Sequence, residues 1–225
     1  MILKPYYDHA GIQIFHGDCR EVLPTLAPVD LVLTDPPYGI ALANHARGKE
    51  RADRSFHVAG DDSTELGQWI ADWCAERDLP ALIFCNPLRP FVGKWRQSLV
   101  WDKGPALGGG GDVATSWKMC HELILAARLQ ELNGPRDSSV LRFWSNAQAM
   151  PDHPCQKPEP LLRYLVNRAS NRDQLILDPF MGSGTTLRAA KDLGRRAIGI
   201  EIEERYCEIA ANRLRQEVLF PAESA

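Results

Sequence analysis

The chain has 225 residues, of which 44% are hydrophobic and 24% are charged, and its formal net charge is −3. This composition fits a single domain over residues 1–225, and no apolar run approaches the roughly 20 residues of a membrane-spanning helix. The slight negative charge argues against a general-purpose nucleic-acid binder, which is usually basic, so any contact with a polyanion would use a local basic patch.

Two strands and a short helix are expected near the start. Residues 12–16 alternate between apolar and polar side chains and end in Gly17-Asp18, which indicates a strand followed by a turn. A short helix is expected over residues 20–27. Residues 29–34 are almost continuously apolar, which is typical of a parallel strand buried on both faces.

The middle of the chain is less regular. Residues 41–63 show neither helical nor strand periodicity, which predicts a long loop that is either functional or a solvated charged segment. A helix is expected over residues 64–76. Strands are expected over residues 81–85, 98–101, 122–127 and 140–144.

The last third alternates clearly between strand and helix patterns. Strands are expected at 175–177 and 197–200, and helices at 161–169, 185–193 and 206–214. This alternation predicts an α/β fold with a doubly wound, mostly parallel, Rossmann-like sheet.

A glycine-rich turn, LDPFMGSGTT, links a predicted strand to a predicted helix. Gly182 and Gly184 allow the backbone to turn tightly and to approach a ligand closely. Glu201 ends the next strand, where an acid can accept both hydrogen bonds of a ribose diol. A nucleotide phosphate is disfavoured, because no Lys precedes Thr185 and Asp178 would repel it. A cationic ligand such as S-adenosylmethionine suits these carboxylates better.

The stretch TDPPYGI ends the strand over residues 29–34 with an acid, two prolines and a tyrosine. Pro36 and Pro37 stiffen the backbone, so that the Asp35 carboxylate and the Pro36 carbonyl become fixed acceptors. Tyr38 supplies a flat face. Two acceptors beside an aromatic ring fit an exocyclic amino group on a planar base.

These motifs resemble those of the amino-methyltransferases of DNA, which methylate N6 of adenine or N4 of cytosine. TDPPYG matches their catalytic motif and LDPFMGSGTT their cofactor motif. HPCQKPEPLLRYLV is similar to the segment that precedes the cofactor motif, and IFHGDCREVLPTL to the strand whose Asp contacts the cofactor adenine. The order of the motifs resembles the β arrangement of the family. Methyltransferases of protein glutamine carry Asn-Pro-Pro-Tyr after the cofactor motif, so residue type and order argue against them.

The resemblance implies S-adenosylmethionine as cofactor and DNA as partner, with direct methyl transfer to a base flipped out of the duplex. It implies a catalytic corner made of Asp35, Pro36, Pro37 and Tyr38. The residues that it implies for cofactor binding are Asp18 (adenine), Glu201 (ribose), Phe180 (methionine), Asp35, Lys157, Asp178, Gly182, Ser183, Gly184 and Thr185.

Contacts with DNA are expected from the loop over residues 41–63, whose basic side chains are Arg47, Lys49, Arg51 and Arg54. A small target-recognition region is expected within residues 104–150. Its small size suggests a short target site or a homodimer that shares contacts.

Three alternatives stay open at this point. Asp at the first position of the catalytic motif favours adenine N6, whereas the N4-cytosine enzymes of this arrangement more often carry Ser. The chain could also be an RNA methyltransferase, or a non-catalytic nucleic-acid-binding subunit that has kept the fold.

Six cysteines without regular spacing suggest reduced thiols in a cytoplasmic protein, and the N-terminus lacks the features of a signal peptide. No metal is expected, because no second ligand pair accompanies His121 and Cys120 at zinc-site spacing.

Overall fold

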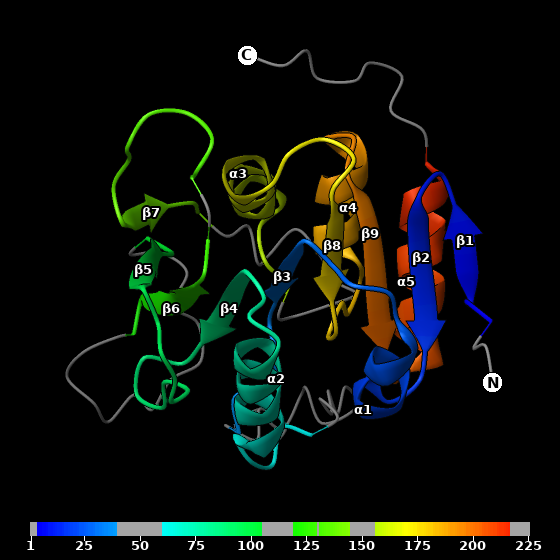
Figure 1. Ribbon diagram of the computed structural model, residues 1–225, viewed down its shortest axis with the longest axis horizontal. Coiled ribbons are helices and arrows are strands. Elements are labelled where there is room, and N and C mark those ends of the chain that lie inside the picture. Colours follow the sequence, from blue (N-terminus) through cyan, green and yellow to red (C-terminus); the bar gives the residue numbers. More distant parts are fainter. Residues whose placement is uncertain (1–3, 40–59, 105–118, 130, 145–155, 217–225) are drawn as a thin grey trace, which may run out of the picture.

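A nine-stranded sheet runs through the computed structural model, which describes residues 4–39, 60–104, 119–129, 131–144 and 156–216 (Figure 1). The strands are β1 (Tyr7–His9), β2 (Ile12–His16), β3 (Leu31–Thr34), β4 (Ala81–Cys85), β5 (Gln97–Asp102), β6 (His121–Ala127), β7 (Val140–Arg142), β8 (Leu175–Asp178) and β9 (Arg196–Glu201). The helices are α1 (Cys19–Val22), α2 (Glu65–Glu76), α3 (Glu159–Ala169), α4 (Thr185–Asp192) and α5 (Glu204–Arg215), with a 3-10 turn over Leu23–Thr25. Within these ranges, no helix combines the length and the apolar character that crossing a bilayer requires.

The strand order is β1-β2-β9-β8-β3-β4-β6-β5-β7. Parallel pairing joins β2, β9, β8, β3 and β4 into one continuous block. The predicted doubly wound, mostly parallel sheet is therefore confirmed. β1, which pairs antiparallel with β2, has no counterpart among the predicted strands, because its three residues are too short a run to show periodicity.

The described parts of the segment 104–150 contribute strands to this sheet. β6 lies between β4 and β5 and runs antiparallel to both, and β7 forms the edge beside β5. These two strands therefore extend the main sheet, and a target-recognition role for this segment stays a prediction.

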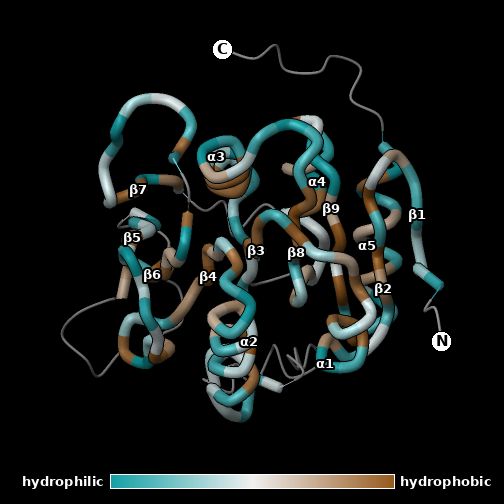
Figure 2. The backbone as a smooth tube through the Cα atoms, in the orientation of Figure 1, coloured by the Kyte–Doolittle hydropathy of each residue, from teal (hydrophilic) through white to brown (hydrophobic). Residues whose placement is uncertain are grey.

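Helices cover both faces of the sheet. α3, α4 and α5 pack on one face, where Leu162, Leu187 and Leu214 join the buried core. α1 and α2 pack on the other face through Val22 and Ile70. Figure 2 shows hydrophobic colour along the strands and on the helix sides turned toward them. The result is a three-layer α/β/α arrangement with a separate apolar core on each side of the sheet.

The carboxyl ends of the parallel strands define one edge of the molecule, toward which the arrows of β2, β8 and β9 point in Figure 1. In spatial order, the parallel strands that end at this edge are β2, β9, β8, β3 and β4, and the first four of them end in or are followed by an acid. These four strands deliver Asp18, Glu201, Asp178 and Asp35 in that order, at or just after the last residue of each strand. Neighbouring strands lie about 4.8 Å apart, so the four carboxylates line up along roughly 14 Å.

The glycine-rich turn packs closely on the sheet beneath it. An added Cβ on Gly199 of β9 would overlap Met181 Sδ and would lie 2.8 Å from Leu187 Cδ2. Gly184, at the start of α4, has a φ of +78°, and its added Cβ would lie 2.7 Å from Ala210 Cβ of α5. Glycine at these two positions lets the turn lie flat between β9, α4 and α5.

Candidate active site

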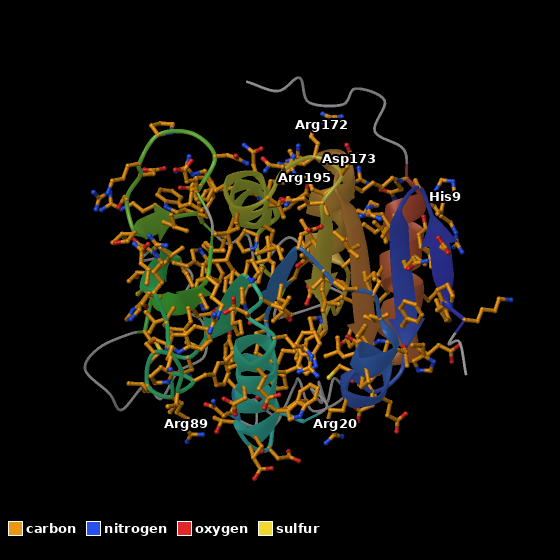
Figure 3. All side chains as sticks on the ribbon, viewed as in Figure 1. His9, Arg20, Arg89, Arg172, Asp173 and Arg195 are labelled. Carbon is orange, nitrogen blue, oxygen red and sulfur yellow. The ribbon has the colours of Figure 1, made fainter. Side chains whose placement is uncertain are left out.

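Asp18, the first of the four carboxylates, is engaged locally. It caps α1 and accepts the backbone N–H of Arg20 at 2.8 Å, and Arg20 Nη2 lies 2.5 Å from Asp18 Oδ2. Hydrogen bonding to Arg20 lowers the pKa of Asp18. Figure 3 shows Arg20 at the carboxyl edge of the sheet. The carboxylate is thus ionised and fixed at this edge, and its contact with a cofactor adenine stays a prediction.

Glu201, the second carboxylate, shapes the glycine-rich turn. Its Oε2 accepts the N–H of Gly182 at 3.0 Å, and its Oε1 accepts the N–H of Glu203 at 2.9 Å. Burial raises the pKa of Glu201. This side chain therefore ties the end of β9 to both the turn and the start of α5.

The turn is also held from α5 and from the segment before α3. Arg213 Nη1 donates to the Ser183 carbonyl at 3.2 Å and to Thr185 Oγ1 at 2.9 Å. Ser183 Oγ and Arg213 Nη2 both donate to Gln156 Oε1, at 3.2 and 3.1 Å. Phe180 is partly buried against the core on the α1/α2 face. Sequence reasoning missed Arg213, because the helical pattern of α5 says nothing about which distant turn its polar face reaches.

Asp178, the third carboxylate, is almost completely buried, at 3% exposure. Its Oδ1 accepts the Thr34 hydroxyl at 2.8 Å and the N–H of Phe180 at 3.2 Å. Burial raises the pKa of Asp178 to about 6. The two hydrogen bonds link the end of β8 to the end of β3, and so the glycine-rich turn to the catalytic motif.

Replacing Asp178 by Asn is expected to stabilise the fold at pH 8. The raised pKa means that the folded protein binds this proton more tightly than the unfolded chain does, so stability falls as the pH rises from about 4 through about 6. The uncharged amide avoids this penalty, and we expect a gain of about 1–3 kcal/mol at pH 8 that disappears near pH 4. Urea unfolding across this pH range measures the effect. Asp72→Asn on the exposed side of α2 is the control, and an equal change in both variants would contradict the prediction.

Asp35 and Tyr38, after β3, form a polar corner beside Asp178. The Tyr38 hydroxyl donates to Asp35 Oδ1, and burial, followed by the charge of Asp35, raises the pKa of Tyr38 well above its ordinary value. Burial also raises the pKa of Asp35. Pro36 and Pro37 are buried, and because proline has no N–H they leave no donor unsatisfied there. The structure thus brings together the four residues that the sequence predicts for the catalytic corner.

A partly buried cluster of charges surrounds this corner. Lys157 Nζ lies 2.5 Å from Asp35 Oδ2 and 3.2 Å from Glu122 Oε2. The other oxygen of Glu122, Oε1, pairs with Lys103, and its Oε2 accepts the Tyr38 hydroxyl at 3.2 Å. Burial alone would raise the pKa of Glu122, but the two lysines outweigh it and hold this pKa below its ordinary value. The structure therefore places the ammonium of Lys157 at the predicted catalytic corner.

Sequence reasoning did not single out Glu122 or Lys103. The sequence feature that could have indicated them is a charged residue beside an apolar strand. Glu122 stands near the beginning of β6, in HELIL, and Lys103 directly follows β5, in VWDKG. These strands become neighbours through the antiparallel pairing of β5 with β6.

Asp61 is a second acid that sequence reasoning missed, and it holds the backbone at Tyr38 and Gly39. Asp61 is 4% exposed, and its Oδ1 accepts the N–H groups of Tyr38 at 3.0 Å and of Gly39 at 2.9 Å. Arg89 Nη1 donates to the Gly39 carbonyl at 2.6 Å from the opposite side. Gly39 has a φ of +68°, so the chain bends sharply between these two contacts. Figure 3 shows Arg89 at the same edge of the molecule as Arg20.

The basic residues predicted to contact DNA, Arg47, Lys49, Arg51 and Arg54, lie outside the described residues. Among the residues that the structure describes, no group of three or more His, Cys, Asp or Glu side chains is placed to hold a metal ion. Cys19, Cys74, Cys85 and Cys207 are buried, and burial raises the pKa of each thiol to about 12, which does not suit a nucleophile.

The chemistry of this edge fits S-adenosylmethionine. A row of carboxylates would repel a nucleotide phosphate but can accept hydroxyl and amino donors and can face a sulfonium. Because the row runs for roughly 14 Å from Asp18 to Asp35, it can serve an elongated ligand with donors at both ends.

Comparisons with known proteins agree with this geometry. The family model described as DNA methylase, of the N6/N4 methyltransferase type, matches residues 96–212. The Type II methyltransferase M2.DpnII of Streptococcus pneumoniae is 52% identical, over 96% of this chain and 94% of its own. M.HinfI of Haemophilus influenzae is 48% identical, over 90% of this chain and 68% of its own.

Two solved structures are similar in fold. The M1.HpyAVI–SAM complex superposes with a TM-score of 0.63 at 26% identity, covering 90% of this chain and 99% of that one. The cytosine-N4-specific PvuII DNA methyltransferase has a TM-score of 0.70 at 16% identity, covering 97% and 91% of the two chains. The chain belongs to the N6/N4 DNA methylase family of S-adenosylmethionine-dependent methyltransferases.

Proposed function

We propose that the protein methylates the exocyclic N6 of adenine at a specific DNA sequence, with the target base flipped out of the duplex. The observation that carries this proposal is the corner in which Tyr38 donates to Asp35 on a stiff, buried Pro-Pro backbone. Asp at the first position supports adenine over cytosine. The Type II methyltransferase name of the relatives supports sequence-specific DNA modification beside a restriction enzyme.

The residues of the corner would activate the amine. The Asp35 carboxylate and the Pro36 carbonyl accept its two N–H bonds, and the Tyr38 ring stacks on the base. Drawing both protons toward acceptors takes the nitrogen lone pair out of conjugation with the ring and makes it more nucleophilic. Burial raises the pKa of Asp35, so this carboxylate is well placed to take the proton that the nitrogen gives up.

Cofactor binding is assigned to the row of carboxylates and to the glycine-rich turn. Glu201 would accept the ribose hydroxyls and Asp18 the adenine amine. Phe180, Asp178 and residues 182–185 would enclose the methionine part. When bound, S-adenosylmethionine supplies an electrophilic methyl group. The contacts of Glu201 and Arg213 with this turn support the assignment, because they fix its shape in advance.

Binding of phosphates by Arg47, Lys49, Arg51 and Arg54 stays a prediction. So do a recognition role for residues 104–150 and a homodimer that shares contacts with DNA.

The test is the identity of the methylated nucleoside. Duplex DNA of mixed sequence is incubated with the protein and tritiated S-adenosylmethionine, then digested and separated. We expect the label in N6-methyladenine. Label in N4-methylcytosine alone would contradict the proposal, and faster transfer to RNA than to DNA would favour an RNA substrate. If calorimetry detected no S-adenosylmethionine binding, the chain would be a non-catalytic subunit.

A further inference from the structure

The ammonium of Lys157 lies at two of the three features that the proposed function gives to the target base, the Asp35 carboxylate and the Tyr38 ring. Its Nζ lies 2.5 Å from Asp35 Oδ2 and 5.6 Å from the centroid of the Tyr38 ring. The Lys157 side chain is 9% exposed and the Asp35 side chain 27%, so this is a partly buried ion pair rather than a surface contact. The Tyr38 hydroxyl holds Asp35 Oδ1, so a base amine that approaches Asp35 Oδ2 competes with the Lys157 ammonium for the same oxygen.

Glu122 is placed to receive the displaced ammonium. Its Oε2 lies 3.2 Å from Lys157 Nζ, and its Oε1 pairs with Lys103, which fixes the carboxylate on β6. The rings of Phe84 and Trp101 lie 5.2 and 5.8 Å from the same Nζ and add cation–π attraction. A short shift toward Glu122 therefore keeps the cation paired, whereas leaving it buried and unpaired would be strongly unfavourable.

We propose that Lys157 is an exchangeable occupant of the amine site, and that Glu122 is a positioning residue that takes over its ammonium when the base enters. This inference rests on the proposed function, since it requires Asp35 to be the amine acceptor. The exchange involves no proton transfer. The neutral amine of the base replaces the Lys157 ammonium at Asp35, and the ammonium moves to Glu122. Before the base arrives, the Lys157 ammonium neutralises the negative charge of Asp35. Only a ligand with N–H donors of its own can replace the lysine there.

The test compares single-turnover methyl transfer to DNA by the parent protein, E122Q, K157M and the double variant, all with saturating S-adenosylmethionine and DNA. E122Q is expected to be about tenfold slower, because the ammonium has lost the charge that draws it away from Asp35. Adding K157M is expected to leave the rate equal to that of E122Q or faster, because no ammonium then competes for Asp35. Glu76→Gln, in an exposed pair with Arg77, is the matched control and should match the parent.

If Lys157 only supported the fold or bound the cofactor, K157M would slow methyl transfer further in the E122Q background. The inference is overturned if the double variant is slower than E122Q. If the parent protein itself methylates no base amine, that result contradicts the proposed function, and the variants need not be compared.

A structure of the parent with duplex DNA and S-adenosylhomocysteine decides the matter if a variant does not fold. Lys157 Nζ is expected within hydrogen-bond distance of Glu122 and beyond it from Asp35 Oδ2. An ammonium still on Asp35 beside a bound base overturns the inference.

Discussion

Asp35→Asn protein is expected to transfer methyl groups to DNA about 10²- to 10³-fold more slowly than the parent at saturating cofactor. The amide keeps the shape of the carboxylate but turns one acceptor into an N–H donor, which faces the N–H bonds of the incoming amine. Its loss of charge also removes the group that can take up the proton released by the nitrogen. Tritium transfer in a single turnover measures the rate.

Two controls separate this effect from a loss of structure. S-adenosylmethionine affinity, measured by calorimetry, should fall far less than the rate of methyl transfer, because Asp35 is only one of the four carboxylates in the row. Asp62→Asn changes an exposed acid next to the brace formed by Asp61 and should leave the rate unchanged. Parental rates in folded, cofactor-binding Asp35→Asn or Asp35→Ala protein would show that the catalytic corner is misassigned.

Glu201→Gln protein is expected to bind S-adenosylmethionine about 10- to 100-fold more weakly, with a smaller change in the rate at saturating cofactor. In the parent, the two carboxylate oxygens accept the N–H groups of Gly182 and Glu203. A glutamine can satisfy one of them, but it turns its own N–H₂ toward the other. The turn then loses part of its preset shape, and the ribose loses a charged acceptor.

Isothermal titration calorimetry measures the loss, with Glu208→Gln on the exposed side of α5 as the matched control. Equal affinities for Glu201→Gln and the parent would mean that the ribose is held elsewhere along the row.

Much of this fold can be read from local sequence patterns. The apolar runs before Asp35, Asp178 and Glu201 predict buried parallel strands, and parallel strands bring their carboxyl ends to one edge. The position of the predicted catalytic and cofactor motifs at this edge follows from that rule, because each motif stands directly after its strand.

The charge cluster could not be predicted in the same way. Lys103, Glu122 and Lys157 come from separate segments, and they meet because β6 enters the sheet between β4 and β5. Residue periodicity indicates that a strand exists but does not give its neighbours. The contact of Asp61 with the backbone of Tyr38 and Gly39 could not be predicted for a related reason, since an acid within a long polar loop carries no signal of which backbone groups it will bind.

The close contact between Gly199 and Met181 has a consequence for how the cofactor region can vary. β9 is hydrogen-bonded to β2 on one side and to β8 on the other, so it has little freedom to shift. A bulkier residue at position 199 would displace Met181, and this movement would reach the neighbouring Gly182, whose N–H is the one that Glu201 accepts. We therefore expect the affinity for S-adenosylmethionine to depend on the residue at position 199, which lies inside the sheet.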